Sequence, residues 1–402
     1  MDNLTRNSLT NKRICDIMQY QSEYMRIAFI GQKGIPTKQG GIEKHVEELS
    51  ARLADLGFDV TVYNRPYYTE KTVNSYQGVN LITLPSLKTK NLDAITHTLF
   101  ASIHALFQNY DIIHYHGVGP SLLSFLPRIF KPRAKVIATF HCLDREHQKW
   151  GWFAKLMLTI GERAACLFPH ETIAISRALE KYCLYNYNTA ARYIPNGVAI
   201  SETENLNVLA EFGLSENNYL VAVSRLVRHK GLHTLIKAYN QLETDKKLII
   251  VGTGANTEDY VAEIKDLAKD NPKIIFAGQK SGADLTALFR NAYLFVQPSE
   301  TEGLSIALLE AMAYGVPAII SNIEENQEAA ENLALEFVNK SPEDLKRKLK
   351  YALENEEIIL ALARRAQARV AREYDWNNIA RDTAGLYREL AAERELILTE
   401  AK

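Results

Sequence analysis

The chain has 402 residues, of which 47% are apolar, 24% charged and 9% aromatic. This length and composition are typical of a globular protein with more than one core, and they predict two or three domains. No apolar run reaches the roughly 20 residues of a membrane-spanning helix, no secretory signal is recognisable, and the 4 cysteines lack metal or redox spacing, so we expect a cytoplasmic protein.

The net charge of −1 conceals an asymmetry between the two halves of the chain. Residues 1–200 hold 23 basic and 16 acidic side chains, a balance of +7, and the rest holds 24 and 32, a balance of −8. Part of the positive charge clusters at Arg128, Lys131, Arg133 and Lys135. This cluster could face an anionic membrane, or it could be a solvated basic loop. We expect no nucleic-acid partner.

The first half of the chain alternates between strand and helix patterns. Residues 1–24 show no periodicity and are interpreted as an N-terminal extension. Short apolar runs predict strands at residues 25–30, 58–63, 81–84, 112–115, 135–140, 172–175 and 193–194. Helical spacing predicts helices at residues 43–56 and 94–108. Strands that are separated by helices imply a parallel sheet with helices on both faces.

The pattern restarts after a polar, irregular segment at residues 198–218. Strands are predicted at residues 219–223, 247–251, 273–276, 294–297 and 317–321. Helices are predicted at residues 232–240, 260–269, 285–291 and 305–314, and the chain beyond residue 342 is predicted to be helical. We therefore expect an α/β fold of two Rossmann-like, doubly wound domains that face a deep cleft. Ligands of such sheets bind outside the carboxyl ends of the strands.

The loop and helix that begin at Glu302 carry the strongest functional signal. Gly303, Leu304 and Ser305 bring free backbone amides to the start of the helix, and Glu310 lies two turns inside it. Helix N-termini bind anions, and carboxylates accept hydrogen bonds from sugar hydroxyls. The alternative is an acid that complements the helix dipole, with a second, solvated glutamate.

Two further segments lie at the ends of predicted strands. Arg225 and Lys230 follow the strand at residues 219–223 and could bind a diphosphate, or they could be surface charges at a helix start. Gly40 and Gly41 close a glycine-rich turn after the first strand, where backbone can approach a ligand or simply adopt a positive φ. The spacing of these glycines is not that of a dinucleotide-binding fingerprint.

Histidine and tryptophan supply weaker candidates. His141 follows a strand end that faces the expected cleft, and His116 lies just before Gly117. The two histidines could form a metal pair. A lone histidine at a strand end is more often structural than catalytic, and because no carboxylate has a supporting spacing we predict no metal site. Trp150 and Trp152 could line an acceptor groove, or they could dock a helix into the core.

Together these motifs resemble those of the family-4 retaining glycosyltransferases of the GT-B fold. The hallmark is the pair Glu302 and Glu310 with seven residues between them, and the match extends through Arg225 and Lys230 and through the segment at residues 194–198. The resemblance covers residues 25 to about 392. The motifs are specific because several of them occur in the order of the family.

Two stretches resemble a narrower group. The opening glycine turn and residues 141–152 are similar to a bacterial rhamnosyltransferase-like subgroup of surface polysaccharide synthesis. The chain departs from the family at His141, because the segment that runs from it to Asp144 lacks the His-Asp or His-Gly pair common there. This departure concerns the acceptor side, and the donor-side motifs are intact.

The resemblance implies a role for each motif residue. Arg225 and Lys230 would neutralise the donor diphosphate and its leaving charge, and His141 would contact the donor sugar near the reacting carbon. Glu302 would bind sugar hydroxyls, and Glu310 the ribose hydroxyls. The other implied donor-binding residues are Gly40, Gly41, Gly278, Gln279, Lys280, Gly303, Leu304 and Ser305. The weaker acceptor candidates are His116, Trp150 and Trp152.

The resemblance also implies a domain plan and an activity. Residues 25–200 would bind the acceptor, residues 201–375 the donor, and a helix at residues 376–402 would return to the first domain. Family members need no metal or other cofactor, and a nucleotide-diphosphate sugar is the co-substrate. We expect transfer to a glycan or lipid-linked acceptor in cell-surface polysaccharide synthesis, with peripheral contact at the inner face of an anionic membrane. A non-catalytic nucleotide-sugar-binding subunit, a nucleotide-sugar epimerase and an NAD-dependent oxidoreductase remain alternatives.

Overall fold

The structure is a computed structural model that describes residues 25–38, 40–68, 73–89, 92–146, 151–255 and 257–400. The predicted N-terminal extension at residues 1–24 and the acceptor candidate Trp150 lie outside the described residues.

An eight-stranded sheet forms the core of the first domain. Its strands are β1 (Arg26–Ile30), β2 (Asp59–Asn64), β3 (Ser75–Tyr76), β4 (Val79–Thr83), β5 (Ile112–His116), β6 (Lys135–Phe140), β7 (Glu171–Ala174) and β8 (Arg192–Tyr193). They follow the order β3-β4-β2-β1-β5-β6-β7-β8, and only β3 runs antiparallel to its neighbour. Every residue of β5 and β6 is buried, because a parallel sheet is covered by helices on both faces.

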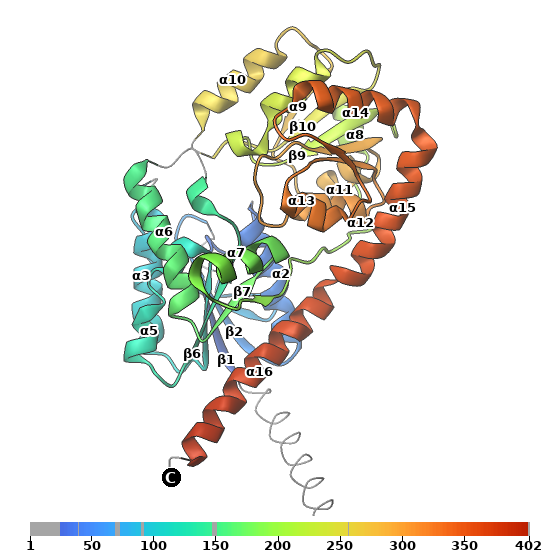
Figure 1. The fold of residues 1–402 in the computed structure, drawn as a ribbon. Helices are drawn as coiled ribbons and strands as arrows, with labels where there is room; N and C mark the ends of the chain where they lie inside the picture. The colour runs from blue at the N-terminus through green and yellow to red at the C-terminus, as the bar shows by residue number, and fades with distance from the viewer. Residues whose placement is uncertain are drawn as a thin grey trace, which may run out of the picture.

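The helices around this sheet come from the connections between its strands (Figure 1). They are α2 (Gly41–Asp55), α3 (Asp93–Leu106), α4 (Val118–Ser121), α5 (Phe125–Phe130), the 3-10 helix η1 (Asp144–Glu146), α6 (Trp152–Leu167) and α7 (Arg177–Tyr187). The predicted apolar stripe of α2 is buried as expected, with Val46, Leu49 and Leu53 facing the core.

A six-stranded parallel sheet forms the core of the second domain. Its strands are β9 (Tyr219–Val223), β10 (Lys247–Val251), β11 (Ile274–Gly278), β12 (Leu294–Gln297), β13 (Ala318–Ser321) and β14 (Leu335–Phe337). Their order is β11-β10-β9-β12-β13-β14. The helices are α8 (Asn207–Glu211), η2 (Arg228–Lys230), α9 (Leu232–Tyr239), α10 (Glu258–Ala268), α11 (Gly282–Arg290), α12 (Ile306–Ala313), α13 (Glu324–Ala330) and α14 (Pro342–Glu354).

Both sheets have the doubly wound order, in which the chain starts in the middle and winds first to one edge and then to the other. The predicted architecture of two Rossmann-like domains is therefore confirmed. The direction of winding reverses between β1 and β5 in the first sheet and between β9 and β12 in the second. Loops diverge at such a reversal, so the carboxyl ends of these strands are where ligands of such sheets bind.

The C-terminal helices connect the second domain back to the first. Helix α15 (Glu356–Glu373) leads into α16 (Trp376–Glu400), which lies along the first domain and packs on α2 (Figure 1). Trp376 is buried, and its ring centroid is 5.4 Å from that of His45 on α2. The predicted return of the last helix is confirmed. None of the helices that the structure describes is both long and apolar enough to cross a bilayer.

Candidate active site

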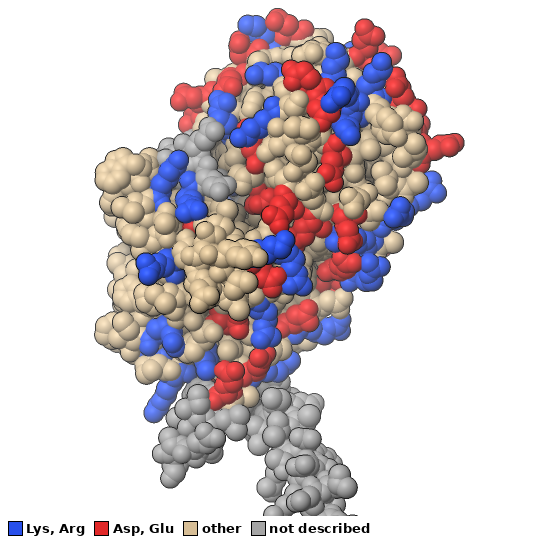
Figure 2. Space-filling model, viewed as in Figure 1, with Lys and Arg blue, Asp and Glu red and all other residues tan. Residues whose placement is uncertain are grey.

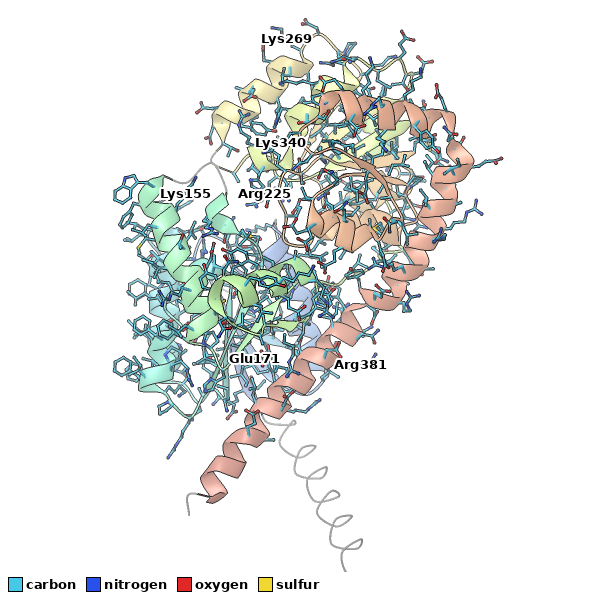
Figure 3. All side chains as sticks on the ribbon, viewed as in Figure 1. Lys155, Glu171, Arg225, Lys269, Lys340 and Arg381 are labelled. Atoms are coloured by element: carbon cyan, nitrogen blue, oxygen red, sulfur yellow. The ribbon has the colours of Figure 1, made fainter. Side chains whose placement is uncertain are left out.

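A cavity of about 770 Å3 lies between the two domains. Its volume is in the range of small-molecule sites, roughly 300–1,000 Å3. The first domain lines it with the turn after β1, the start of α2 and the loop after β6, and the second domain with the loops after β9, β10 and β12. The carboxyl ends of both sheets therefore face one cavity. Arg225 lies on the side of the second domain that faces the first (Figure 3).

Arg225 and Lys230, the predicted diphosphate ligands, line this cavity, and Lys230 lies next to Glu302. Lys230 and Arg225 come from the loop after β9, and the Nζ atom of Lys230 is 2.5 Å from Oε1 of Glu302. The Nε2 atom of Gln297 donates to the same oxygen at 2.8 Å. Gly231 makes this approach feasible: its φ is +67°, and a Cβ there would lie 1.8 Å from the carbonyl oxygen of Pro298.

The start of α12 faces the same cavity. Ser305 caps the helix, because its Oγ atom accepts a hydrogen bond from the amide of Leu308 at 3.3 Å. Gly303 packs against the first domain so closely that a Cβ would lie 1.8 Å from the carbonyl oxygen of His141. The amides at this helix start and the positive end of its dipole form an anion-binding surface.

Glu310 lines the cavity from the second turn inside α12, and its side chain is half-buried. Burial raises the pKa of this carboxyl to about 7, although the nearby Lys44 ammonium opposes the shift. Lys44 comes from α2 of the first domain and lines the same cavity. The carboxyl therefore changes its charge close to neutral pH.

Three buried histidines meet on the first-domain side. Nε2 of His141 lies 3.3 Å from Nδ1 of His116, and the ring of His45 stands edge-on to His141 at 4.8 Å. Burial lowers the pKa of His45 to about 4 and the pKa values of His116 and His141 well below their ordinary value. All three imidazoles are therefore neutral at physiological pH.

These histidines are also the group, among the described residues, with the geometry to hold a metal ion. One ring nitrogen from each of His45, His116 and His141 lies within 4.8 Å of the others. Neutral imidazole is a common metal ligand. Nδ1 of His45 lies 2.9 Å from the Oδ1 atom of Asn196 and His116 is hydrogen-bonded to His141, whereas the Nε2 atoms of His45 and His116 are buried without a hydrogen-bond partner. The absence of a metal remains a prediction.

The predicted glycine-rich turn connects β1 to α2 and lines the cavity. Gly40 is the N-cap of α2 with a φ of 108°, and Gly40 and Gly41 both line the cavity. The Oε1 atom of Glu43 accepts a hydrogen bond from the amide of Lys33 at 3.1 Å, which holds the turn over the helix start.

The predicted donor-binding segment from Gly278 to Lys280 is only partly in the cavity. Gln279 and Lys280 line it, whereas Gly278 ends β11 and is not among the lining residues. Lys280 forms an ion pair with Glu211 at 3.0 Å. The side-chain amide of Gln279 donates to the backbone oxygen of Lys38 in the first domain.

The acceptor candidates have separate positions. His116 is buried and hydrogen-bonded to His141, and it is not among the residues that line the cavity. Trp152 is the first residue of α6, is 79% exposed and is not among the residues that line the cavity. The alternative that these aromatics dock a helix into the core is wrong for Trp152, because its ring faces outward.

Among the residues that line the cavity, Lys44 and Asn196 have contacts that sequence reasoning did not anticipate. Lys44 belongs to no recognised motif. A lysine in the first turn of a helix is usually a solvated charge, so the sequence offered no reason to assign it to the cavity. Asn196 belongs to a motif that was recognised without a role for it. Its Oδ1 atom contacts His45, and its Nδ2 atom donates to the backbone oxygen of Leu304 at 3.1 Å, so it bridges the two domains.

Two protein families match successive parts of the chain. Residues 39–202 match Glycosyltransferase Family 4, and residues 209–369 match Glycosyl transferases group 1. The first match covers most of the first domain, and the second covers the sheet and helices of the second domain.

Individual relatives agree with these matches. An uncharacterized glycosyltransferase of Methanocaldococcus jannaschii is 25% identical over 90% of this chain and 98% of its own. The O-antigen biosynthesis glycosyltransferase WclY of Escherichia coli is 23% identical over 62% of this chain and 71% of its own. The fold is similar to that of HepE of Anabaena in complex with UDP-glucose, with a TM-score of 0.75 and 20% identity over 90% of this chain and 99% of that one.

Proposed function

The chain belongs to the family-4 (group 1) glycosyltransferases, which use nucleotide-sugar donors, and from this premise we propose that it builds a cell-surface polysaccharide. It transfers a hexosyl or deoxyhexosyl group, with retention of configuration, to a glycan or to a lipid-linked acceptor. The resemblance of the glycine turn to rhamnosyltransferase-like enzymes supports this proposal, as does the likeness to an O-antigen glycosyltransferase.

One observation carries the proposal. Two cations, Arg225 and Lys230, and two carboxylates, Glu302 and Glu310, line one cavity around the N-terminus of α12. A nucleotide-diphosphate sugar needs both types of group, because its diphosphate is anionic and its sugar and ribose present hydroxyl pairs. His141 lies on the opposite wall, where the first domain closes on Gly303.

The residues would act as follows. Arg225 and Lys230 neutralise the diphosphate as the bond between the sugar C1 and the phosphate oxygen breaks. The acceptor hydroxyl attacks the same face of C1, and its proton passes to the departing phosphate oxygen. Glu302 and the amides at the start of α12 hold the sugar hydroxyls, and Glu310 holds the ribose. The neutral His141 contacts the sugar beside the reacting carbon.

The two domains would divide the substrates. We assign the acceptor to residues 25–200 and the donor to residues 201–375, and we assign the nucleobase to the segment from Gly278 to Lys280. We place the enzyme in the cytoplasm at the inner face of the membrane. Nucleotide sugars are made in the cytoplasm, and a lipid-linked acceptor would be presented there.

Calorimetry with UDP-, GDP- and dTDP-sugars, in EDTA and with NAD as a control, tests the donor site. UDP-glucose is a natural first ligand, because HepE was solved in complex with it. We expect one sugar nucleotide to bind and NAD to give no heat. Binding that needs an added metal would contradict the metal-free mechanism, and binding of NAD alone would contradict the proposal.

Substitution of the charged residues tests turnover. Lys230→Ala removes a diphosphate contact and the partner of Glu302, and Glu310→Gln removes the ribose carboxylate. We expect each to lower kcat/KM by about 10²- to 10³-fold with unchanged circular dichroism. Lys269→Ala, at an exposed lysine directly after α10, is the matched control and should behave as the parent protein. Donor binding with no turnover for any acceptor would favour the non-catalytic subunit, and conversion of the donor alone would favour the epimerase.

A further inference from the structure

The outer surface of the first domain carries an apolar face that packing inside this chain does not use. Helix α3, with the residue that follows it, exposes Leu99, Phe100, Ile103 and Phe107, which recur at helical spacing along one side. Phe107 is 82% exposed. A surface helix normally presents polar residues to water, so an apolar outer side on a helix that is also apolar inside indicates a further partner.

Helices α5 and α6 extend this face. Phe130 and Ile129 at the end of α5 are 67% and 63% exposed. Trp152 and Phe153 begin α6, and Leu156 and Ile160 continue its outer side at intervals of one turn. Helix α3 contacts α5 directly, and α4 joins α3 to α6. Aromatic side chains project outward from all three helices on one side of the domain (Figure 3). We call this surface the α3–α5–α6 face.

Among the residues that the structure describes, exposed apolar side chains are most concentrated on this face. Every Phe or Trp that is exposed in the described part of the chain lies on the α3–α5–α6 face. Exposed apolar residues elsewhere, such as Leu206 and Val338, stand among polar neighbours, as is normal for a protein surface. The clustering therefore needs a physical explanation.

The charged side chains around the α3–α5–α6 face indicate what kind of partner it binds. Arg128 and Arg133 are exposed beside its α5 end, and Lys155 and Arg163 are exposed along α6. The acids that the structure describes in α3, α5 and α6 are Asp93, which is half-buried and paired with Arg65, and Glu162, which is buried. In Figure 2 this side of the first domain is tan with scattered blue side chains. Apolar and aromatic residues fringed by cations suit a bilayer with anionic lipids.

The basic cluster predicted from the sequence is only the edge of this surface. Lys135 is buried at the start of β6, and the Nζ atom of Lys131 donates to the backbone oxygen of Leu106 at 3.3 Å. Arg128 contacts His170, and Arg133 is exposed. The cluster alone would bind a membrane weakly, whereas the apolar side chains supply the larger contribution.

The α3–α5–α6 face reaches the edge of the cleft between the two domains. His141 and Asp144 line the cavity, and Trp152 lies only eight residues beyond Asp144 in the sequence. The start of α6, marked by Lys155 in Figure 3, lies at the edge of the gap between the domains. A lipid-linked acceptor in the bilayer would therefore emerge next to the opening of the cavity.

We propose that the α3–α5–α6 face docks this chain on an anionic bilayer and presents the cleft to an acceptor anchored in the same membrane. This proposal rests on the proposed function in one respect only, namely that the acceptor is lipid-linked. The contact itself follows from the side chains on the surface. The phenylalanine and tryptophan rings enter the interface between headgroups and acyl chains, and the arginine and lysine side chains pair with lipid phosphates.

Vesicle flotation with the full chain tests the proposal. The vesicles contain phosphatidylcholine alone or with about 30% phosphatidylglycerol, which supplies the negative charge. Two triple variants remove apolar side chains from opposite ends of the face: Phe107→Gln with Ile129→Gln and Phe130→Gln, and Trp152→Gln with Phe153→Gln and Leu156→Gln. The control combines Tyr185→Gln, Leu206→Gln and Val338→Gln, whose parent side chains are equally exposed elsewhere.

We expect the parent chain and the control to float with anionic vesicles, and each triple variant to partition at least about tenfold less. Lys155→Gln with Arg163→Gln should reduce binding to anionic vesicles and leave the weaker binding to neutral vesicles unchanged. Failure of the parent chain to float, or equal flotation of the triple variants, would overturn the proposal. So would a dimer in solution that the same triple variants dissociate, because a second copy would then cover the face.

Sugar-nucleotide calorimetry without vesicles separates this proposal from the proposed function. None of the residues changed in the first triple variant lines the cavity, so this variant should bind the donor like the parent chain. Loss of flotation with intact donor binding supports docking. Flotation of a chain that binds no sugar nucleotide would support docking and contradict the proposed function alone.

Discussion

At the scale of the residue, Glu310 is the group of the cavity whose charge changes near neutral pH. Burial raises the pKa of its carboxyl to about 7, against an ordinary value of 4.5. The folded chain thus keeps a proton that the unfolded chain releases. This carboxyl therefore contributes stability below about pH 4.5 and loses that contribution as the pH rises through 7.

The same shift predicts a pH-dependent affinity for the donor. A carboxylate accepts from ribose hydroxyls better than a protonated acid, so the Kd for a sugar nucleotide should fall as the pH rises, by roughly tenfold between pH 6 and pH 8. Calorimetry with the intact sugar nucleotide measures this Kd at each pH. The diphosphate of the sugar nucleotide does not ionise between pH 6 and pH 8, so it does not contribute to the change. The buried histidines do not interfere, because their pKa values are low.

Glu310→Gln is the control for this assignment. Its affinity should be lower at pH 8 and independent of pH, and the variant should be more stable than the parent at pH 8 by up to about 3 kcal/mol. A variant that keeps the parent's pH dependence would show that another group titrates.

At the scale of the element, α16 is connected to the histidines beside the cavity by a buried chain of contacts. The Oη atom of Tyr387 lies 2.6 Å from Nδ1 of His114, whose Nε2 lies 2.7 Å from Oγ1 of Thr139. The ring of His114 packs on that of His116 at 4.2 Å, and His116 is hydrogen-bonded to His141. The helix therefore supports the wall of the cavity as well as the first domain.

Tyr387→Phe should loosen this attachment. It leaves Nδ1 of His114 without its partner in a buried site, at a cost of about 1–3 kcal/mol. We expect a lower unfolding midpoint in denaturant and faster proteolysis within α16. Tyr293→Phe, which removes a comparable buried bond to the backbone oxygen of Ala352 in the second domain, should lower the midpoint without exposing α16. Equal proteolysis of the two variants would contradict the attachment.

At the scale of the whole molecule, the active site depends on how closely the two domains meet. Gly303 touches the backbone of His141, and Asn196 joins His45 to the backbone of Leu304. These contacts bring the start of α12 against the first domain. A side chain at residue 303 would occupy the space of the His141 carbonyl.

Gly303→Ala should therefore hold the cleft open while each domain stays folded. We expect kcat to fall about a hundredfold, because the catalytic groups are displaced by an ångström or more, and small-angle scattering should report a larger radius of gyration. Gly385→Ala in α16 is the control, since its Cβ would meet nothing within 4 Å. That control should keep full activity and gain slightly in stability. Normal turnover in Gly303→Ala would contradict the requirement for this contact.

Local sequence determined most of the strands and the donor-side motifs, whereas helices such as α7 and α13 were not predicted. Strands such as β6 and β9 were predicted with their observed ends, because buried parallel strands are continuous apolar runs. Strands β3 and β14 were missed, since two or three residues give no periodicity. Glu302, Glu310, Arg225 and Lys230 were found because each follows a strand end or helix start, where side chains reach a ligand.

Only the tertiary structure decided which residues from distant segments meet. The Lys230–Glu302 pair, the approach of Lys44 to Glu310 and the bridge made by Asn196 join segments with no sequence relation. The exposure of Phe107 and Trp152 could not be predicted from the sequence either. An apolar residue in a helix is expected in the core unless the positions of its neighbours in the fold are known. The sequence by itself determined the two domains and the chemical groups of the site. Chain folding decided their mutual geometry and the face that remains open to a partner.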